Sequence, residues 1–244
     1  MSHRTTAVCP ATKAQVPVVS LQLSLLRLRK LRWVLQQPQR LKLLRRRLAP
    51  SLEHEGLLCD RQFTTVIDVG ANVGQFALFA AAKLGTTNLI CIEPQSGALA
   101  HLPTFLEPFG CHAEVQEVAL SDHTGVAPLH VTRASDSSSL LTPTHSMCLT
   151  DGGRSVTRRM DVEVVVGDDA IIRDDRPGPV LLKVDVQGTE LSVLRGLRGT
   201  LGWIDAVLVE VSFDQLYENQ SRPQDVIDLL RAQGFGLSAI APVP

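Results

Sequence analysis

The stretch Val66–Phe76, VIDVGANVGQF, constrains the fold more than any other part of the chain. Its first four residues are apolar except for one aspartate, which is typical of the end of a buried strand. A turn with glycine or asparagine at positions 70, 72 and 74 follows, and helical spacing then runs from Gln75 to Leu84 before Gly85. The pattern predicts a strand, a turn and a helix. Because glycine has no Cβ, such a turn lets a ligand approach the backbone above the helix N-terminus.

The spacing within the turn indicates which ligand it would take. A dinucleotide fingerprint is G-x-G-x-x-G, and its middle glycine lets a pyrophosphate come close. This chain has D-x-G-x-N-x-G, with Asn72 where that glycine is expected. That pattern is usual for S-adenosylmethionine (SAM) sites, which hold no pyrophosphate, and it disfavours a nucleotide-binding oxidoreductase. Glu93 ends the next apolar run about 20 residues further on, where an acid accepts hydrogen bonds from ribose hydroxyls. We therefore favour a SAM site over a turn that holds no ligand.

The charge of the chain is distributed unevenly. Residues 1–52 hold 11 Lys and Arg residues and no acid, whereas the rest holds 13 of the 24 basic residues and all 25 acidic ones, a balance of −12. We therefore divide the chain into a basic N-terminal arm, 1–52, and a domain, 53–244. Residues 1–20 are expected to form a disordered tail.

Residues 21–48 of the arm alternate leucines with arginines and lysines, and Pro38 predicts a break between two amphipathic helices. We favour a helical cap that lies on the domain. Peripheral contact of residues 21–48 with an anionic membrane is the alternative that stays open. Nucleic-acid binding is not expected, because few aromatic residues interleave the basic ones and the acidic domain would repel phosphate.

The cysteines and the apolar runs indicate the compartment. The five cysteines are scattered without a CxxC pair, which favours reduced thiols over a disulfide framework or a zinc site; they are Cys9, Cys59, Cys91, Cys111 and Cys148. No apolar run reaches ~18 residues, and the N-terminus lacks the layout of a signal peptide. We expect a cytoplasmic protein, with the inner face of the membrane as the place of any peripheral contact.

Apolar runs and turn residues predict alternating strands and helices. The predicted strands are 66–69, 88–92, 114–120, 126–131, 161–166, 180–186, 206–211 and 237–240, and the predicted helices are 75–84, 99–109, 190–201 and 223–233. The polar residues 133–159 are expected to form a long loop over the site. Continuous apolar strands that alternate with helices predict an α/β fold, with a mostly parallel sheet covered by helices on both faces.

Several stretches in order resemble the FkbM family of SAM-dependent methyltransferases. They are VIDVGANVGQFAL (66–78), IEP (92–94), ALSD (119–122), SSSLL (137–141), LLKVDVQGTELSVLRG (181–196) and VEVSFDQLYENQ (209–220). The resemblance implies a Rossmann-like class I methyltransferase fold and transfer of a methyl group from SAM to a hydroxyl of a sugar, glycolipid or polyketide-type small molecule. The C-terminal strand that usually closes this fold is missing from the predicted elements, so a truncated, non-catalytic binding module is the alternative function.

The resemblance also implies which residues hold SAM. Asp68 and the turn residues Gly70, Ala71, Asn72 and Gly74 would shape the pocket for the methionine end. Glu93 would hold the ribose. Ser121 and Asp122, after the third predicted strand, would meet the adenine.

Four charged residues on or just after the later strands are candidates for the chemistry. Asp185 leaves the fourth strand of the parallel sheet beside the expected methyl group, and Lys183 lies two residues back on the same face. Asp185 or Glu190 could take the proton of the acceptor hydroxyl, and Glu210 is placed similarly at the end of the next strand. The alternative is that Lys183 and Asp185 form a structural ion pair and that Glu190 stabilises its helix. A divalent metal ion on Asp185 and Glu210 stays an open alternative, although no tight carboxylate cluster demands one.

Overall fold

A computed structural model describes residues 18–45, 48–58, 60–149, 155–172 and 178–242. Its centre is a five-stranded parallel sheet in the order β3-β2-β1-β7-β8. The strands are β1 (Thr65–Val69), β2 (Asn88–Ile92), β3 (His112–Gln116), β7 (Val180–Val184) and β8 (Ala206–Val209). The order reverses direction at β1, so the crevice above β1 and β7 is a topological switch point, where α/β proteins bind ligands. The predicted α/β class is confirmed.

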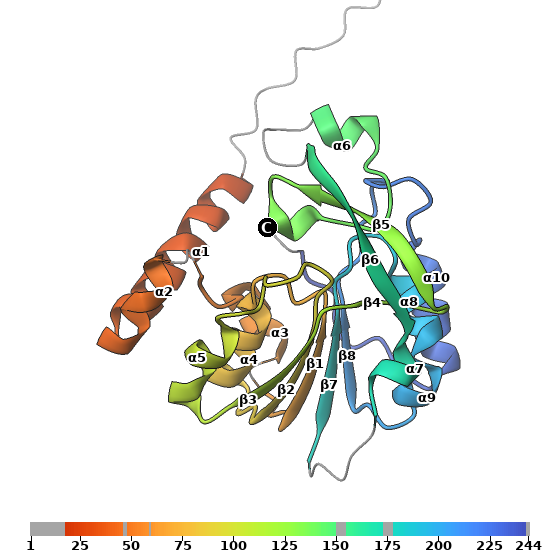
Figure 1. The fold of residues 1–244 in the computed structure, drawn as a ribbon. Helices are drawn as coiled ribbons and strands as arrows, with labels where there is room; N and C mark the ends of the chain where they lie inside the picture. The colour runs from red at the N-terminus through yellow and green to blue at the C-terminus, as the bar shows by residue number, and fades with distance from the viewer. Residues whose placement is uncertain (1–17, 46–47, 59, 150–154, 173–177, 243–244) are drawn as a thin grey trace, which may run out of the picture.

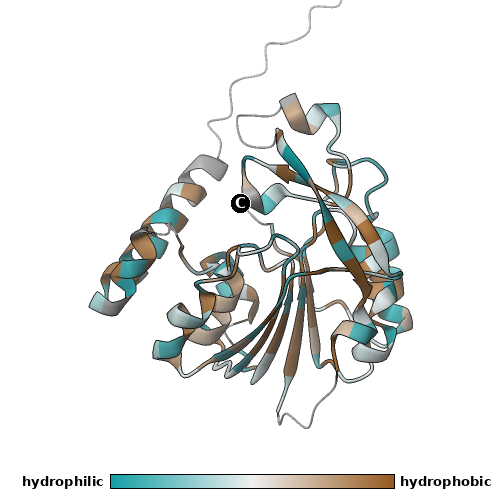
Figure 2. Cartoon of the chain, in the orientation of Figure 1, coloured by the Kyte–Doolittle hydropathy of each residue, from teal (hydrophilic) through white to brown (hydrophobic). Residues whose placement is uncertain are grey.

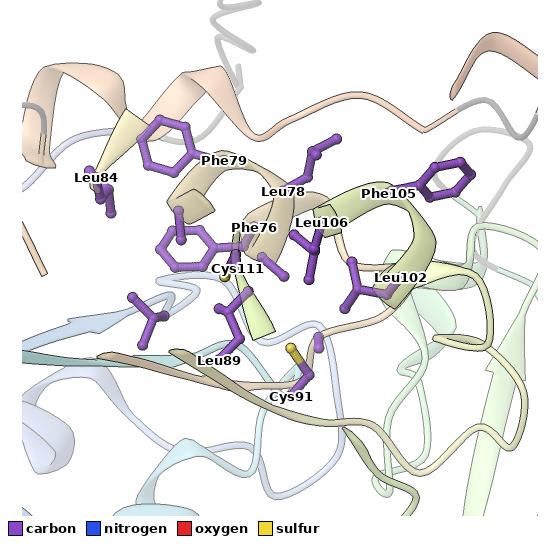
Figure 3. Close-up of a cluster of buried hydrophobic side chains, with 14 of the residues drawn as sticks. Phe76, Leu78, Phe79, Leu84, Leu89, Cys91, Leu102, Phe105, Leu106 and Cys111 are labelled. Atoms are coloured by element: carbon purple, nitrogen blue, oxygen red, sulfur yellow. The ribbon is translucent and has the colours of Figure 1, made fainter. Parts of the chain in front are cut away.

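Helices cover both faces of this sheet, as Figure 1 shows. One face is covered by α4 (Gln75–Lys83) and α5 (Leu102–Leu106), and the other by α8 (Glu190–Gly196), α9 (Arg198–Leu201) and α10 (Pro223–Ala232). Side chains alternate along β1, so Val66 packs toward α4 whereas Ile67 and Val69 pack toward α8. Figure 3 shows the core under α4 and α5, where phenylalanines and leucines meet Cys91 and Cys111. Neither sulfur is in a disulfide.

The predicted third strand, 114–120, is wrong as one element. It divides into β3, which ends at Gln116 in the parallel sheet, and β4 (Ala119–Ser121), which belongs to a second sheet. That sheet has the order β4-β6-β5, with β5 (Gly125–Thr132) antiparallel to β6 (Val156–Val166) and β4 parallel to it. The chain leaves one sheet for the other at 117–118, where the sequence has neither glycine nor proline.

The predicted loop 133–159 is partly ordered into regular elements. It contains η4 (Ser135–Ser137), α6 (His145–Leu149) and the first residues of β6, while 150–154 lie outside the described residues. A short helix, α7 (Gly167–Ala170), follows β6. The predicted helix 99–109 is shorter than expected, because α5 gives way to η3 (Glu107–Phe109).

The last predicted strand, 237–240, is also wrong. Residues 235–242 form no helix or strand, and within the described residues β8 has β7 on one side and no strand on the other. The predicted helix 190–201 is interrupted at Leu197 between α8 and α9.

The N-terminal helices pack on the domain. They are α1 (Val18–Leu35) and α2 (Leu41–Arg45), separated at Pro38 by η1 (Pro38–Arg40) as the sequence predicts; η2 (Leu52–His54) and α3 (Glu55–Leu58) follow. Trp33 stacks on Phe109 with ring centroids 6.3 Å apart, and Leu43 is buried in the same core. The arm and the domain therefore share a hydrophobic core, while the division at 52/53 stays a prediction. Residues 1–17 of the predicted tail, Cys9 and Cys59 lie outside the described residues.

Candidate active site

The carboxyl ends of β1, β2, β7 and β8 meet at one edge of the parallel sheet and form the floor of a cleft of about 1550 Å³. Most of the predicted site residues line this cleft: Gly70, Ala71, Asn72, Glu93, Lys183, Asp185, Glu190 and Glu210. Asp68 lies directly below them, completely buried, and Gly74 begins α4 behind the turn. The structure thus brings together side chains from four strands.

The turn after β1 is fixed between its two neighbouring strands. The backbone N–H groups of Gly70 and Ala71 donate to the carbonyl oxygen of Ile92, at 3.0 and 3.1 Å. Gly70 has a φ of 77°, and a Cβ at this position would lie 1.8 Å from the carbonyl oxygen of Asp185. Only glycine fits where β1 and β7 approach so closely. Asn72, two residues on, also has a positive φ of 50°.

Glu93 holds this turn from the end of β2. Its carboxylate accepts the backbone N–H of Asn72 at 2.8 Å and that of Gln95 at 3.0 Å, one on each oxygen. Burial raises the pKa of Glu93, and these two hydrogen bonds oppose the rise. Each oxygen keeps a second lone pair for a further donor, such as a ribose hydroxyl.

Lys183 and Asp68 form a buried ion pair beneath the cleft. The Lys183 Nζ lies 3.0 Å from Oδ1 of Asp68 and donates to the carbonyl oxygen of Gly70 at 3.0 Å, while Oδ2 of Asp185 lies 3.6 Å away. Burial lowers the pKa of Lys183, but the charges of Asp68 and Asp185 outweigh it and the pKa rises. Lys183 is therefore a cation that contacts both the turn and Asp68, and because it stays protonated it cannot act as a base at neutral pH.

Asp185 is oriented by Gln187, which the sequence did not single out. The Gln187 Nε2 donates to Oδ1 of Asp185 at 2.7 Å, and the residue adopts a positive φ of 59°. Its Oε1 accepts the buried hydroxyl of Tyr217 at 3.1 Å, and its carbonyl oxygen accepts the Ser139 hydroxyl at 2.7 Å. The segments 137–141 and 209–220 thus converge on Gln187, which in turn contacts Asp185.

Two further carboxyls have pKa values close to neutral pH. Burial raises the pKa of Glu190 to about 7, although the carboxylate accepts the backbone N–H of Gly188 at 2.8 Å. Burial and the negative charge of Asp185 raise the pKa of Glu210 to about 7 as well. Glu190 therefore holds the turn before α8, and Glu210 faces the cleft.

His54 belongs to the cleft, and sequence reasoning missed it. It comes from η2, lines the cleft together with Asp185, and packs edge-on against Phe76 with ring centroids 5.3 Å apart. Burial lowers the pKa of His54, against the opposing charge of Glu53, so the ring is neutral near pH 7. No motif contains it, since it lies just after the boundary predicted from charge alone.

Ser121 and Asp122 do not line the cleft. Their assignment to adenine assumed a third strand that ends at Leu120, whereas the third strand of the parallel sheet ends at Gln116. Ser121 is buried instead where its carbonyl oxygen would lie 1.9 Å from a Cβ placed on Gly196. The residues that line the cleft at this point are Val118, Ala119 and Leu120.

Comparison with known proteins supplies the family. The chain matches the methyltransferase FkbM domain over residues 68–237. It belongs to the FkbM methyltransferase family. The match covers every strand of the parallel sheet from the end of β1 onward and confirms the predicted family and the Rossmann-like fold.

Three curated relatives match this FkbM chain at low identity. The hexuronic acid methyltransferase AglP of Haloferax volcanii is 28% identical over 146 residues, 59% of this chain and 54% of AglP. The 2-O-methyltransferase NoeI of Sinorhizobium fredii is 27% identical over 186 residues, 71% of this chain and 73% of NoeI. The AMB antimetabolite synthetase AmbE of Pseudomonas aeruginosa is 26% identical over 206 residues, 71% of this chain and 10% of AmbE. The chain thus spans about half of AglP and a tenth of AmbE. No solved structure matches it.

The family implies SAM, and the cleft has the donors and acceptors to hold it. The Oδ1 of Asn72 is buried without a hydrogen-bond partner among the described residues, and the Glu93 carboxylate keeps free lone pairs beside it. Among the residues that the structure describes, no group of three His, Cys, Asp or Glu side chains is arranged to hold a metal ion.

Proposed function

We propose that this protein is a SAM-dependent O-methyltransferase that acts on a hydroxyl of a sugar-type small molecule. The observation that carries the proposal is that the turn after β1 and the carboxylate of Glu93 lie in the same cleft as Asp185. The proposed cofactor site and the proposed reaction site would therefore be adjacent at the switch point of the sheet. The names of AglP and NoeI support a sugar-type acceptor.

The residues of the cleft would have different roles. Gly70, Ala71 and Asn72 would hold the methionine end of SAM, with Asp68 and Lys183 fixing the turn from below. Glu93 would accept the ribose hydroxyls, and the apolar residues 118–120 would lie against the adenine. Gly74 would shape the site indirectly, because its φ of 87° lets the chain enter α4 at the end of the turn.

When bound, SAM supplies a methyl group on a positively charged sulfur. The chain must place the acceptor oxygen in line with that group and receive the proton that the hydroxyl loses. Asp185, whose side chain is held by Gln187, would orient the acceptor oxygen. Its carboxylate borders the cleft beside Lys183. Neutral His54 and the carboxylate of Asp185 are two groups that could receive the proton. Glu190 and Glu210 stay candidates as well, because a pKa of about 7 lies close to the pH at which a general base would work.

Titration calorimetry with SAM, its demethylated product S-adenosylhomocysteine and NAD tests the cofactor. We expect binding of the first two compounds and none of NAD. Incubation with radiolabelled SAM and a panel of hexuronic acids and neutral sugars then tests the transfer. SAM binding without transfer to any member of the panel would favour the alternative, a non-catalytic binding module, and NAD binding alone would overturn the assignment.

A further inference from the structure

Helix α1 carries apolar side chains on two sides. Trp33 and Val34 are buried against the domain. On another side, Leu28, Leu31 and Leu35 are exposed by 62%, 43% and 56%. Their spacing of three and four residues puts them on one face of the helix. A helix that only capped the domain would have polar residues there.

The exposed face continues onto α2. Leu41 and Leu44 are exposed by 44% and 43%, while Leu43 between them is buried. Six of the twelve large apolar side chains that are exposed among the described residues belong to these two helices, so they form a patch rather than isolated cases. We call the patch the leucine face: Leu25, Leu28, Leu31, Leu35, Leu41 and Leu44. Figure 2 shows apolar and polar residues interspersed along both helices.

Basic side chains of the arm fall into two groups. Arg29 pairs with Glu55, Lys30 with Glu53 at 2.8 Å, and the Arg40 guanidinium lies 3.8 Å from the Trp33 ring centroid; Lys42 donates to the carbonyl oxygen of Thr104 at 3.1 Å. These contacts anchor the arm. Arg27 and Arg32 are exposed and make no ion pair with any described residue, so their charges remain available to an external partner.

We propose that the leucine face docks on the surface of an anionic lipid bilayer. An apolar face flanked by unpaired arginines is the pattern of a helix that lies in the membrane interface, where leucines enter the acyl boundary and arginines meet lipid phosphates. None of the described helices could cross a bilayer on length and hydropathy, so the contact is peripheral. A two-fold dimer through this face would bring two basic arms together, which like-charge repulsion disfavours.

Docking would place the cleft beside the lipid. The side of α1 that holds Leu26, Lys30 and Val34 forms part of the cleft wall. Leu31 and Leu44 of the leucine face also border the cleft, so the face adjoins its rim. A bilayer bound to α1 would therefore bring the cleft close to molecules at the membrane surface. This inference rests on the arm alone and stands whether or not the cleft transfers a methyl group.

Co-sedimentation of the full chain with vesicles tests the proposal. We expect binding to vesicles of phosphatidylglycerol and phosphatidylcholine in equal parts, no binding to pure phosphatidylcholine, and weaker binding as salt increases. Leu28→Glu with Leu35→Glu should lower the affinity at least about tenfold, because both side chains leave the apolar phase. The matched control is Val126→Glu with Ile172→Glu, whose wild-type side chains are exposed by 74% and 78% outside the arm. It should bind like wild type.

A second variant keeps the test independent of folding. Arg27→Gln with Arg32→Gln keeps the leucine face and should weaken binding to the vesicles that contain phosphatidylglycerol. The proposal would be overturned if the wild-type protein did not bind the vesicles. It would also be overturned if Leu28→Glu with Leu35→Glu lost no more affinity than Val126→Glu with Ile172→Glu. Sedimentation equilibrium tests the other occupant of the leucine face. If the wild-type protein did not bind vesicles but formed a dimer that Leu28→Glu with Leu35→Glu dissociates, the face would bind a second copy of the chain.

Discussion

The ammonium of Lys183 lies 3.0 Å from Oδ1 of Asp68, and both side chains are buried beneath the candidate active site. This geometry favours a structural role for Lys183 in supporting the turn, and the catalytic role stays a prediction to be tested. We expect Lys183→Met to lower the free energy of unfolding by about 3–5 kcal/mol, because Asp68 is left as an uncompensated buried charge. Denaturant unfolding measures the change.

The control for this prediction is Arg222→Met, which removes a cation from the exposed pair with Asp225. It should leave stability nearly unchanged, because exposed pairs contribute little. Asp68→Asn added to Lys183→Met should recover part of the loss. If Lys183→Met is as stable as Arg222→Met but inactive, Lys183 acts in the chemistry instead.

Gly70 and Gly97 form a matched pair for the close approach of β1 and β7. Their φ angles are 77° and 74°, but a Cβ on Gly70 would meet the Asp185 carbonyl oxygen at 1.8 Å, whereas nothing lies within 4 Å of one on Gly97. Gly97→Ala should cost about 1–2 kcal/mol of stability, the strain of a left-handed alanine. Gly70→Ala should cost about 1–3 kcal/mol more, or prevent folding. Equal thermal unfolding midpoints for the two variants would contradict the packing described above.

The ribose assignment makes Glu93 the carboxylate on which SAM affinity depends. Glu93→Ala should weaken SAM binding by about 1–3 kcal/mol, because hydrogen bonds to a charged group are lost and the N–H of Asn72 loses its acceptor. Glu117→Ala is the control, since Glu117 also accepts a backbone N–H, from Gly97 at 2.7 Å, but does not line the cleft. Calorimetry compares the two, and equal affinities would remove Glu93 from the ribose site.

The raised pKa of Glu210 predicts a pH-dependent effect on stability. Its pKa is about 7 in the folded protein against an ordinary 4.5, so the native state binds more protons than the unfolded state between these values. The contribution of Glu210 to stability is therefore complete below pH 4.5 and is lost as the pH rises through about 7. Glu210→Gln should gain stability relative to wild type between about pH 5 and about pH 8.

Denaturant unfolding across this pH range measures the difference. Exposed Glu163, changed to Gln, provides the control, and its difference from wild type should stay flat. A flat difference for Glu210→Gln as well would show that Glu210 titrates like a solvated carboxyl.

The sequence predicted the β1–α4 unit and the positions of Glu93 and Asp185, because glycines and buried apolar runs mark these places locally. It did not predict the division of 114–120 between two sheets, since EVQEVAL reads as one strand and only pairing of β4 with β6 separates its end. His54 and Gln187 were missed for a similar reason. Their roles depend on contacts with residues far away in the chain, such as Tyr217, which no local pattern records.

The proposed roles of Asp185 and His54 can be distinguished by measuring turnover and its pH dependence. Asp185→Asn keeps the shape and the contact with Gln187, and it removes the charge. If Asp185 receives the proton or orients the acceptor, turnover with a hexuronic acid acceptor should fall about 10²–10⁴-fold, with SAM affinity little changed. If His54 receives the proton, His54→Gln should show that fall and lose the decline of wild-type activity at low pH, because neutral His54 is the active form. Exposed His101, changed to Gln, should alter neither quantity. Near-normal turnover in both variants would leave activation of the hydroxyl to Glu190, Glu210 or proximity.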